Sequence, residues 1–239
     1  MLEKDRIIVL HTIKHSDSGM VVQCYSASRG RCACYFFAKS KNSRNSQMFP
    51  LSVLDVVLHF RTQNGGSMPM IKEASPTVPL NNLKTDIHKG AISIFMCELL
   101  LKTLREGDAD PRLMEFLSSS AMLLDAMDEG VENFHLHFAV SLCNRLGYMP
   151  ADNYSDICRH FDFTKGSFCA NYNEAFCFSP DESLLLHKIL STPLSQLPEI
   201  KCNGEARNRF LGKIIDYISF HTSFKTELKS LPVMRELFG

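Results

Sequence analysis

The sequence predicts an α+β fold, in which a small five-stranded β-barrel precedes an all-helical domain. Five apolar, β-branched or aromatic runs fill the first 75 residues, and turn sequences that contain glycine separate them. From about residue 82, hydrophobic residues instead recur at intervals of three and four, as in core-facing helices. We therefore expect a barrel domain over residues 1–80 and a helical domain over residues 81–239.

The expected strands are short and joined by turns. They cover residues 7–13, 20–26, 32–38, 51–60 and 70–74, with Asp17-Ser-Gly, Ser28-Arg-Gly-Arg and Asn64-Gly-Gly as turn sequences. Each turn offers a glycine where a positive φ would be needed. Strand residues alternate between faces, so Tyr35 and Phe37 share one face, and Cys34 and Phe36 share the other. The sequence leaves open which pair is buried.

The expected helices begin with one whose core-facing residues are Ile87, Ala91, Ile94, Phe95, Leu99 and Leu101. Asp110 and Pro111 open a second helix, and a third covers residues 131–146 and ends at Gly147. Residues 151–178 lack a helical period, which indicates a loop with a small hairpin near residues 165–166. Further helices are expected over residues 181–190, 204–222 and 226–237.

Charge is distributed unevenly along this neutral chain, which has 26 Lys and Arg and 26 Asp and Glu. Residues 1–80 hold 10 basic and 5 acidic side chains (+5), and residues 81–239 hold 16 and 21 (−5). No acidic residue lies between Asp17 and Asp55. This asymmetry indicates a phosphate-facing surface on the barrel, although a solvated hairpin edge that blocks aggregation is the alternative.

The candidate residues for nucleic-acid binding are basic side chains that neutralise phosphates and aromatic rings on which bases stack. The central group is Arg29, Arg31, Lys39, Lys41 and Arg44, with Tyr35 and Phe37 as stacking candidates and Lys14, Arg61 and Lys72 as possible extensions. On the expected third helix, His137 and Arg145 are candidates for receiving an acidic partner peptide. His135 and His137 are two residues apart, a poor spacing for a metal pair on a helix.

Several function classes are not expected. No apolar run approaches the roughly 20 residues of a spanning helix, and the first residues do not resemble a secretory signal. Nine cysteines, an odd number, suit a reducing compartment, so we expect a cytoplasmic protein with mostly buried thiols. Neither a Walker A loop nor G-x-S-x-G, H-E-x-x-H or a catalytic-cysteine signature occurs, so we do not expect an enzyme.

Short stretches along almost the whole chain resemble the RecO family of bacterial DNA repair proteins. The resemblance lies in their order and spacing, since each motif alone is short. The stretches are residues 6–17, 21–25 leading to Gly30, 49–51, 71–74, Asn133-Phe134, Phe138, 146–150, 161–163 with Gly166, and 228–237.

The resemblance implies an N-terminal OB-fold, a helical C-terminal domain and a non-enzymatic role as a recombination mediator. It implies that the chain binds single- and double-stranded DNA, anneals complementary strands and assists loading of the recombinase RecA. The implied partners are RecR and the acidic tail of the single-stranded-DNA-binding protein, with a place at the nucleoid and no membrane. An adaptor that keeps the fold and binds only proteins is the alternative.

The chain departs from the resemblance at one place. Many members of the family carry a four-cysteine zinc site made of two C-x-x-C pairs, but this chain contains no C-x-x-C. The same region offers only Cys158, Cys169 and Cys177, with His160 nearby. A structural zinc site usually needs four ligands, so we expect no cofactor, and zinc or a thiol-dependent enzyme that uses these four residues is kept as an alternative.

Overall fold

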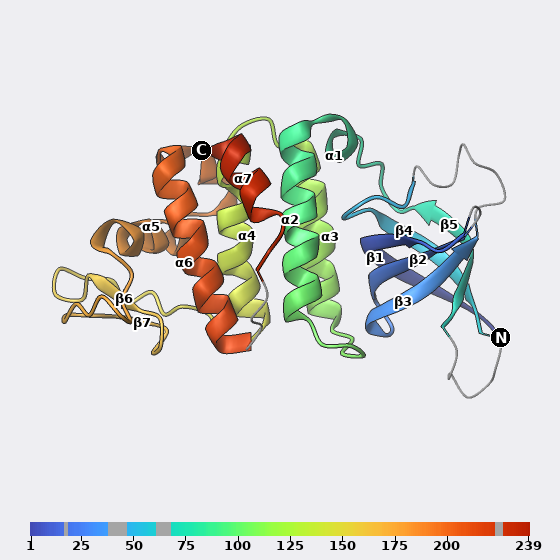
Figure 1. Cartoon of the computed structure of the whole chain (residues 1–239), viewed down its shortest axis with the longest axis horizontal. Coiled ribbons are helices and arrows are strands. Elements are labelled where there is room, and N and C mark those ends of the chain that lie inside the picture. The colour runs from blue at the N-terminus through green and yellow to red at the C-terminus, as the bar shows by residue number, and fades with distance from the viewer. Residues whose placement is uncertain (17–18, 38–46, 61–67, 223–226) are drawn as a thin grey trace. The chain divides into compact units, whose positions relative to one another are not determined.

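The computed structural model describes residues 1–16, 19–37, 47–60, 68–222 and 227–239 (Figure 1). The chain forms two compact units, residues 1–126 and 127–239. The first unit contains five strands and the helices α1, α2 and α3, and the second contains the remaining helices and a two-stranded hairpin. The fold is therefore α+β, as the sequence predicts.

Five strands close into a barrel in the first unit. They are β1 (Leu2–Lys14), β2 (Gly19–Ser26), β3 (Gly30–Phe37), β4 (Val53–His59) and β5 (Met70–Pro76). Their order around the barrel is β1-β2-β3-β5-β4, with β1 antiparallel to both β2 and β4. A short parallel pairing of β3 with β5 completes the ring. This arrangement is that of an OB-fold.

The barrel interior is filled by the alternate residues of each strand. Cys34 and Phe36 are buried, with 0% and 2% of their surface exposed, whereas Phe37 is 47% exposed. The structure thereby shows that Cys34 and Phe36 are the buried pair of β3, which alternation alone leaves open. Tyr35 and Phe37 lie on the outer face, where they are available to a ligand.

Two glycines in the barrel are required for different reasons. Gly30 has a φ of 65°, as the predicted turn requires, and a Cβ there would lie 2.3 Å from the backbone of Asp108. Gly19, predicted for a positive φ, is instead an ordinary strand residue. A Cβ on Gly19 would lie 1.9 Å from the hydroxyl of Tyr35, so this glycine leaves room for the tyrosine ring.

Three helices belong to the same unit as the barrel: α1 (Asn82–Thr85), α2 (Ile87–Thr103) and α3 (Pro111–Ala126). Helix α2 packs on β1, where the thiol of Cys97 donates to the backbone oxygen of Val9 at 3.5 Å. Two predicted core positions of α2 are wrong, because Ile87 and Ile94 are 67% and 53% exposed. Ser93 and Met96 are buried instead.

The second unit consists of α4 (Val131–Arg145), α5 (Pro180–Ser191), α6 (Gly204–Thr222) and α7 (Leu231–Phe238), with a 3-10 helix over Leu194–Glu199. The predicted hairpin is present as β6 (His160–Asp162) and β7 (Ser167–Cys169). Buried Arg207 joins three parts of this unit by donating to Asn133, Cys202 and Phe238. Helix α4 ends as predicted, with Gly147 at a φ of 85°.

Helix α7 begins later than the sequence predicts. The expected helix starts at residue 226, but residues 227–230 lie outside the helix that the structure describes, and α7 starts at Leu231. Pro232 fits here because a proline is tolerated in the first turn of a helix and not in its interior.

Among the described residues, no helix is both long and apolar enough to cross a membrane.

Candidate nucleic-acid interface

The β2–β3 turn, with two of the predicted phosphate-binding arginines, forms a well-bonded end of the barrel that we call the hairpin end (residues 25–31). The guanidinium of Arg29 pairs with the carboxylate of Glu3 at 2.8 Å and lies over the ring of Phe60, 4.2 Å from its centroid. Its backbone N–H donates to Ser26. Arg29 is thus engaged by its own chain, and a phosphate would compete with Glu3.

Arg31, at the same end, is engaged by the loop between α2 and α3. Its guanidinium lies 3.3 Å from Glu106, and 23% of its side chain is exposed. The neighbouring Tyr25 is fully buried, and its hydroxyl accepts from the N–H of Asp110 at 2.9 Å and lies 3.2 Å from the backbone oxygen of Asp108. These contacts fasten the hairpin end to the loop between α2 and α3. Arg29 and Arg31 therefore have a structural role that does not depend on DNA.

The other end of β3 carries aromatic rings at the surface, of which His15 and Phe37 are exposed and Tyr35 is half-buried. His15, Tyr35 and Phe37 form a series that we call the aromatic row. The ring centroids of His15 and Tyr35 are 5.7 Å apart at 85°, and those of Tyr35 and Phe37 are 6.0 Å apart at 46°. Because β3 rises about 3.4 Å per residue, Phe37 lies roughly 20 Å along the strand from Arg31. The aromatic row is therefore a separate surface.

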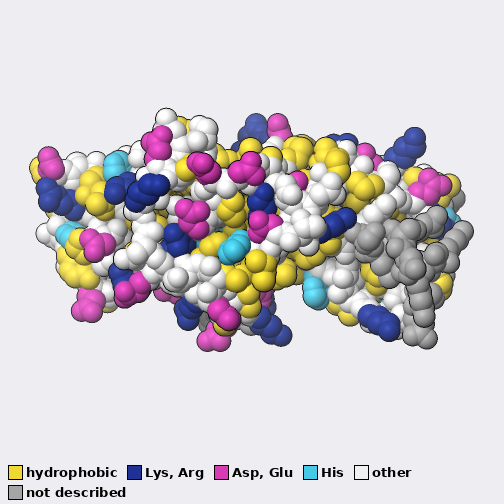
Figure 2. Space-filling view, turned by 90° about the horizontal axis from the view of Figure 1, so that it is seen from above, with side chains coloured by type: hydrophobic (Ala, Val, Ile, Leu, Met, Phe, Trp, Pro, Cys, Tyr) yellow, Lys and Arg dark blue, Asp and Glu magenta, His cyan; other side chains and the backbone are white. Residues whose placement is uncertain are grey.

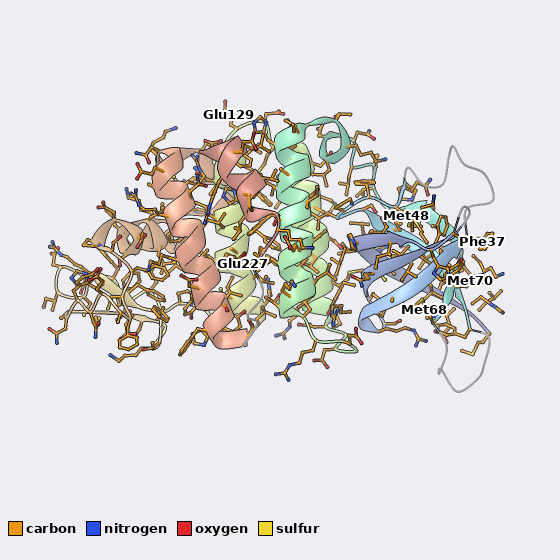
Figure 3. All side chains as sticks on the ribbon, in the orientation of Figure 1. Phe37, Met48, Met68, Met70, Glu129 and Glu227 are labelled. Carbon is orange, nitrogen blue, oxygen red and sulfur yellow. The ribbon has the colours of Figure 1, made fainter. Side chains whose placement is uncertain are left out.

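Apolar side chains extend the aromatic row onto the neighbouring strand. Tyr35 lies opposite Val21 on β2 and opposite Met70 on β5. Met68 is 49% exposed just before β5, and Figure 3 shows it near Met70 and Phe37 at the same end of the barrel. Flat rings and flexible thioethers beside one another suit the faces of nucleobases, which need no sequence-specific partner for stacking.

Basic residues lie on both sides of the aromatic row. Lys14 is an exposed residue at the end of β1, next to His15, and Lys72 is exposed on β5, where the pairing with β4 is irregular between Ile71 and Glu73. The remaining predicted basic residues, Lys39, Lys41, Arg44 and Arg61, lie outside the described residues. The structure therefore places Lys14 next to His15 and Lys72 on β5, the strand that pairs with β3 at Tyr35, whereas Arg29 and Arg31 lie at the other end of β3.

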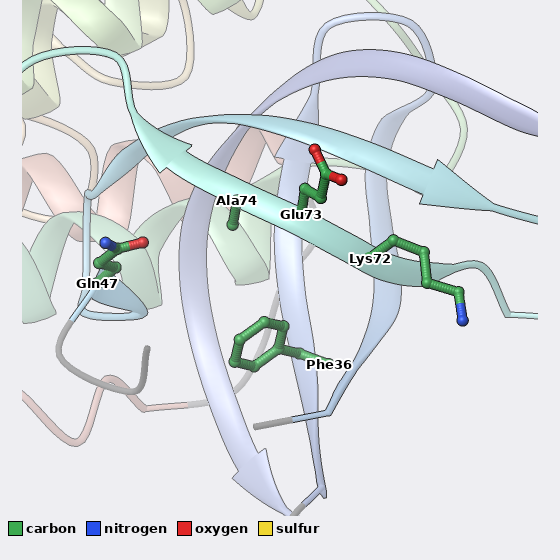
Figure 4. Close-up of a pocket in the computed structure, with 5 residues that line it drawn as sticks. All are labelled: Phe36, Gln47, Lys72, Glu73 and Ala74. Carbon is green, nitrogen blue, oxygen red and sulfur yellow. The ribbon is translucent and has the colours of Figure 1, made fainter. Parts of the chain in front are cut away.

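A small pocket opens where β3 and β5 pair for only two residues. It has a volume of about 90 Å³ and is lined by Phe36, Gln47, Lys72, Glu73 and Ala74 (Figure 4). Pockets for small-molecule ligands typically measure about 300–1,000 Å³. This one is too small for a cofactor or a nucleobase, so the exposed outer face is the better candidate for binding.

Basic and acidic side chains are interspersed on the face drawn in Figure 2. On the barrel itself, a third arginine is also paired, because Arg6 lies 2.9 Å from Asp55. Exposed surface pairs of this kind contribute little stability, about 0–1 kcal/mol each. These pairs matter here because they neutralise arginines. A count of charges along the sequence treats the same arginines as available for phosphate binding.

The predicted partner-binding pair lies on α4. His137 is half-buried and within 3.3 Å of the hydroxyl of Ser141, and burial lowers its pKa. Arg145 is exposed in the last turn, about 12 Å further along the helix axis. Phe134 and Phe138 are each 2% exposed and belong to the core of the second unit. The apolar row next to His137 is thus occupied by the protein's own packing.

The cysteines of the second unit do not complete a zinc site. Within the described residues, Cys169 and Cys177 come together with Asp162, with donor atoms within 4.8 Å of one another, and Cys158 and His160 are not in this group. The carboxylate of Asp162 already accepts from the backbone and hydroxyl of Thr164 and pairs with Lys165 at 2.9 Å. Structural zinc prefers four free ligands, so these residues do not fit it.

Sequence reasoning missed His15, Met68 and Met70 as parts of the exposed surface. His15 lies between an expected strand and the turn sequence Asp17-Ser-Gly, a position that gives no signal of function. Met70 begins an expected strand, and Met68 lies just before it. A signal was present in the cross-strand register, because a hairpin centred on residue 28 places Tyr35 opposite Val21 and therefore near the end of the first strand.

Comparison with known proteins gives matches over nearly the whole chain. The family model described as Recombination protein O N terminal matches residues 1–79, and the model described as Recombination protein O C terminal matches residues 84–232. Proteins of Christiangramia forsetii and Phocaeicola vulgatus, both named DNA repair protein RecO, are each 30% identical over the full length of both chains. A protein of Flavobacterium johnsoniae with the same name is 29% identical over 99% of each chain.

Proposed function

This chain belongs to the RecO family of DNA repair proteins, and we propose that it binds single-stranded DNA on the outer face of its barrel and anneals complementary strands. The observation that carries the proposal is the aromatic row of His15, Tyr35 and Phe37 on an exposed strand face. Each ring offers a stacking platform that every base can use.

Charge supports the same surface. Lys14 is next to His15, and Lys72 lies on β5, which pairs with β3 at Tyr35. The segment that follows Phe37 contains Lys39, Lys41 and Arg44 with no acidic residue. Phosphate repulsion opposes the approach of two complementary strands, and neutralisation by lysine and arginine releases condensed counterions. One basic surface that holds both strands therefore lowers the barrier to annealing without a catalysed reaction. Double-stranded DNA would use the same phosphate contacts.

The acidic residues 81–239, with a net charge of −5, suit contacts with proteins better than contacts with DNA. In this proposal, the chain passes DNA to RecA with the help of RecR and contacts the acidic tail of the single-stranded-DNA-binding protein. His137 and Arg145 are the proposed contacts for that tail: Arg145 carries a positive charge, whereas His137, whose pKa burial lowers, would offer its neutral imidazole as a hydrogen-bonding group. An Arg145→Glu variant would weaken tail binding and leave DNA binding unchanged.

The test is the salt dependence of binding to a fluorescent single-stranded oligonucleotide, measured by anisotropy. If four or five phosphates are neutralised, the slope of log K against log salt is about −3 to −3.5. Replacing Lys39, Lys41 and Arg44 by Glu would flatten this slope. A control with the same change in charge replaces the exposed residues Lys188, Lys201 and Arg235 of the second unit by Glu.

Two results would contradict the proposal. Absence of DNA binding at low salt would favour a protein adaptor with an OB-fold. If both triple variants weakened DNA binding equally, the loss would reflect net charge and would not locate the DNA on the barrel. Annealing is measured in the same samples from the rate at which two complementary labelled strands pair. The proposal requires this rate to fall together with DNA affinity.

A further inference from the structure

Three cysteines converge inside the barrel. Cys24 lies on β2, and Cys32 and Cys34 lie on β3. The sulfur of Cys24 is 3.8 Å from that of Cys32 and 4.0 Å from that of Cys34, and all three sulfurs lie within 4.8 Å of one another. The sequence predicts mostly buried thiols, and it does not predict that these three sulfurs lie together.

The hairpin register brings these sulfurs together. Ser26 lies opposite Gly30 across the turn, so Cys24 lies directly opposite Cys32. Residues 32 and 34 point to the same face of β3 because side chains alternate along a strand. The same turn that exposes the aromatic row on the outer face therefore collects three thiols on the inner face.

Apolar side chains surround the three thiols. Cys24 and Cys34 have no exposed surface and belong to the barrel core, where Val9 lies opposite Cys24 and Val22 opposite Cys34, and Cys32 is partly buried at the edge of that core. Hydrogen bonds from Cys24 and then Cys34 lower the pKa of the Cys32 thiol, and the contact with Cys32 raises the pKa of Cys24. One thiolate is thereby favoured beside two thiols, and the partly buried Cys32 gives access from solvent.

We propose that Cys24, Cys32 and Cys34 bind one monovalent copper ion, Cu(I), in trigonal sulfur coordination. Sulfurs in a plane around one ion, at a metal–thiolate distance of about 2.3 Å, would lie about 4.0 Å apart. Two of the three separations in the protein are 3.8 and 4.0 Å. Soft thiolates in an apolar interior favour Cu(I), whereas zinc normally takes a fourth ligand.

Binding in this site exchanges protons for the metal ion and involves no change of oxidation state. Each thiol that coordinates as a thiolate releases its proton to solvent as the sulfur–copper bond forms. The guanidinium of Arg29 favours the thiolate of Cys32, and the carboxylate of Asp5 opposes it. The bound ion would link β2 to β3 and stiffen the strands that carry Tyr35 and Phe37.

The test is titration of the reduced full-length protein with Cu(I) under anaerobic conditions, in competition with the Cu(I) chelator bicinchoninate. The wild type is expected to take one equivalent from the chelator and to develop ultraviolet thiolate–copper absorption. Cys34→Ser and the partly buried Cys32→Ser are expected to lose this equivalent. Cys143→Ser is the matched control, because Cys143 is a fully buried thiol of α4 whose sulfur donates to Ala139.

X-ray absorption of the copper-loaded wild type is expected to show three sulfur neighbours at about 2.3 Å. Circular dichroism checks that each variant is folded, and Cys24→Ala repeats the test with an apolar replacement. Failure of the wild type to compete with bicinchoninate, or full retention of the equivalent in Cys32→Ser and Cys34→Ser, would overturn the proposal. These outcomes are independent of DNA binding, because the readout is the metal alone.

Discussion

The two ends of β3 carry similar sequence signals and serve different purposes. At the hairpin end, Arg29 and Arg31 are paired with Glu3 and Glu106, and the buried Tyr25 is bonded to the loop at residues 108–110. At the other end, the ring of Tyr35 lies against Gly19 and between His15 and Phe37, and Phe37 is 47% exposed. Charge at one end supports the fold, and aromatic surface at the other is left for a ligand.

This difference shows that a basic residue is evidence for DNA binding only after its partners are known. Arg31 and Glu106 are 75 positions apart in the sequence, so no local pattern reveals that they pair. The exposed fraction of an aromatic ring on a barrel is a more direct indicator, since burying such a ring in the core would be favourable and leaving it exposed needs a reason.

The largest expected effect concerns DNA affinity at the aromatic row. Replacing Tyr35 and Phe37 together by Ala is expected to weaken binding by about 2 kcal/mol or more, since each stacked base contributes about 1–3 kcal/mol. That loss raises the Kd roughly 30-fold. Anisotropy with a labelled oligonucleotide measures it. Phe220→Ala is the control, because Phe220 is 53% exposed and lies in the second unit. An equal loss of DNA affinity in this variant would contradict the assignment of DNA binding to the aromatic row.

The next effect is on stability at the hairpin end. Tyr25→Phe leaves the N–H of Asp110 without its acceptor and is expected to lower the free energy of unfolding by about 1–3 kcal/mol, measured in urea. Circular dichroism follows the unfolding transition. DNA affinity should stay within twofold of wild type, and a large loss of affinity with intact folding would place part of the interface at this end.

The same tyrosine predicts a pH dependence. Burial raises the pKa of the Tyr25 phenol above its ordinary value of 10. The unfolded chain therefore releases this proton at lower pH than the folded protein does, so the contribution of Tyr25 to stability is present below pH 10 and declines as the pH rises above 10. Between pH 9.5 and 11, the free energy of unfolding should fall less in Tyr25→Phe than in the wild type. If it fell equally with pH in both proteins, ionisation of Tyr25 would not be the cause.

A smaller effect is expected for one phosphate contact. Lys72→Glu should reduce the steepness of the log K against log salt plot by about 0.7, the value for one phosphate on a single strand. Lys188→Glu makes the same change of charge at an exposed position of α5 and should leave the slope unchanged. If Lys72→Glu left the slope unchanged, Lys72 would not contact a phosphate, and β5 would not belong to the phosphate-binding surface.

The smallest effect is expected at Arg31. Arg31→Gln removes an ion pair whose carboxylate is 77% exposed, so the free energy of unfolding should fall by less than about 1 kcal/mol. DNA affinity and its salt slope should be unchanged, as read by the same urea and anisotropy measurements. A flattened slope would show that phosphate displaces Glu106 and that both ends of β3 bind DNA.

Much of this fold follows from local signals. Alternation and the turn at Gly30 predict the strands, and intervals of three and four predict most helices, including the end of α4 at Gly147. The exposure of Ile87 and Ile94 could not be predicted in this way, because α2 contacts the barrel and α3 on several sides and its hydrophobic residues form no single stripe.

The candidate site was less predictable than the fold. Residue type and alternation single out Tyr35, Phe37, Lys14 and Lys72, but their grouping with His15 and Met70 depends on pairing across the four strands β1, β2, β3 and β5. The three barrel cysteines are similar, since Cys24 and Cys32 meet only through the register of the hairpin. Residue type gives the candidates, and long-range pairing decides which of them share a surface.

The most direct test of the central claim uses a tryptophan at position 37, because the chain has no tryptophan of its own. In Phe37→Trp, single-stranded DNA is expected to quench the fluorescence at low salt, and added salt to restore it. Phe220→Trp is the control and should not respond. Unquenched fluorescence in Phe37→Trp, while anisotropy shows the oligonucleotide bound, would contradict the placement of DNA on the aromatic row.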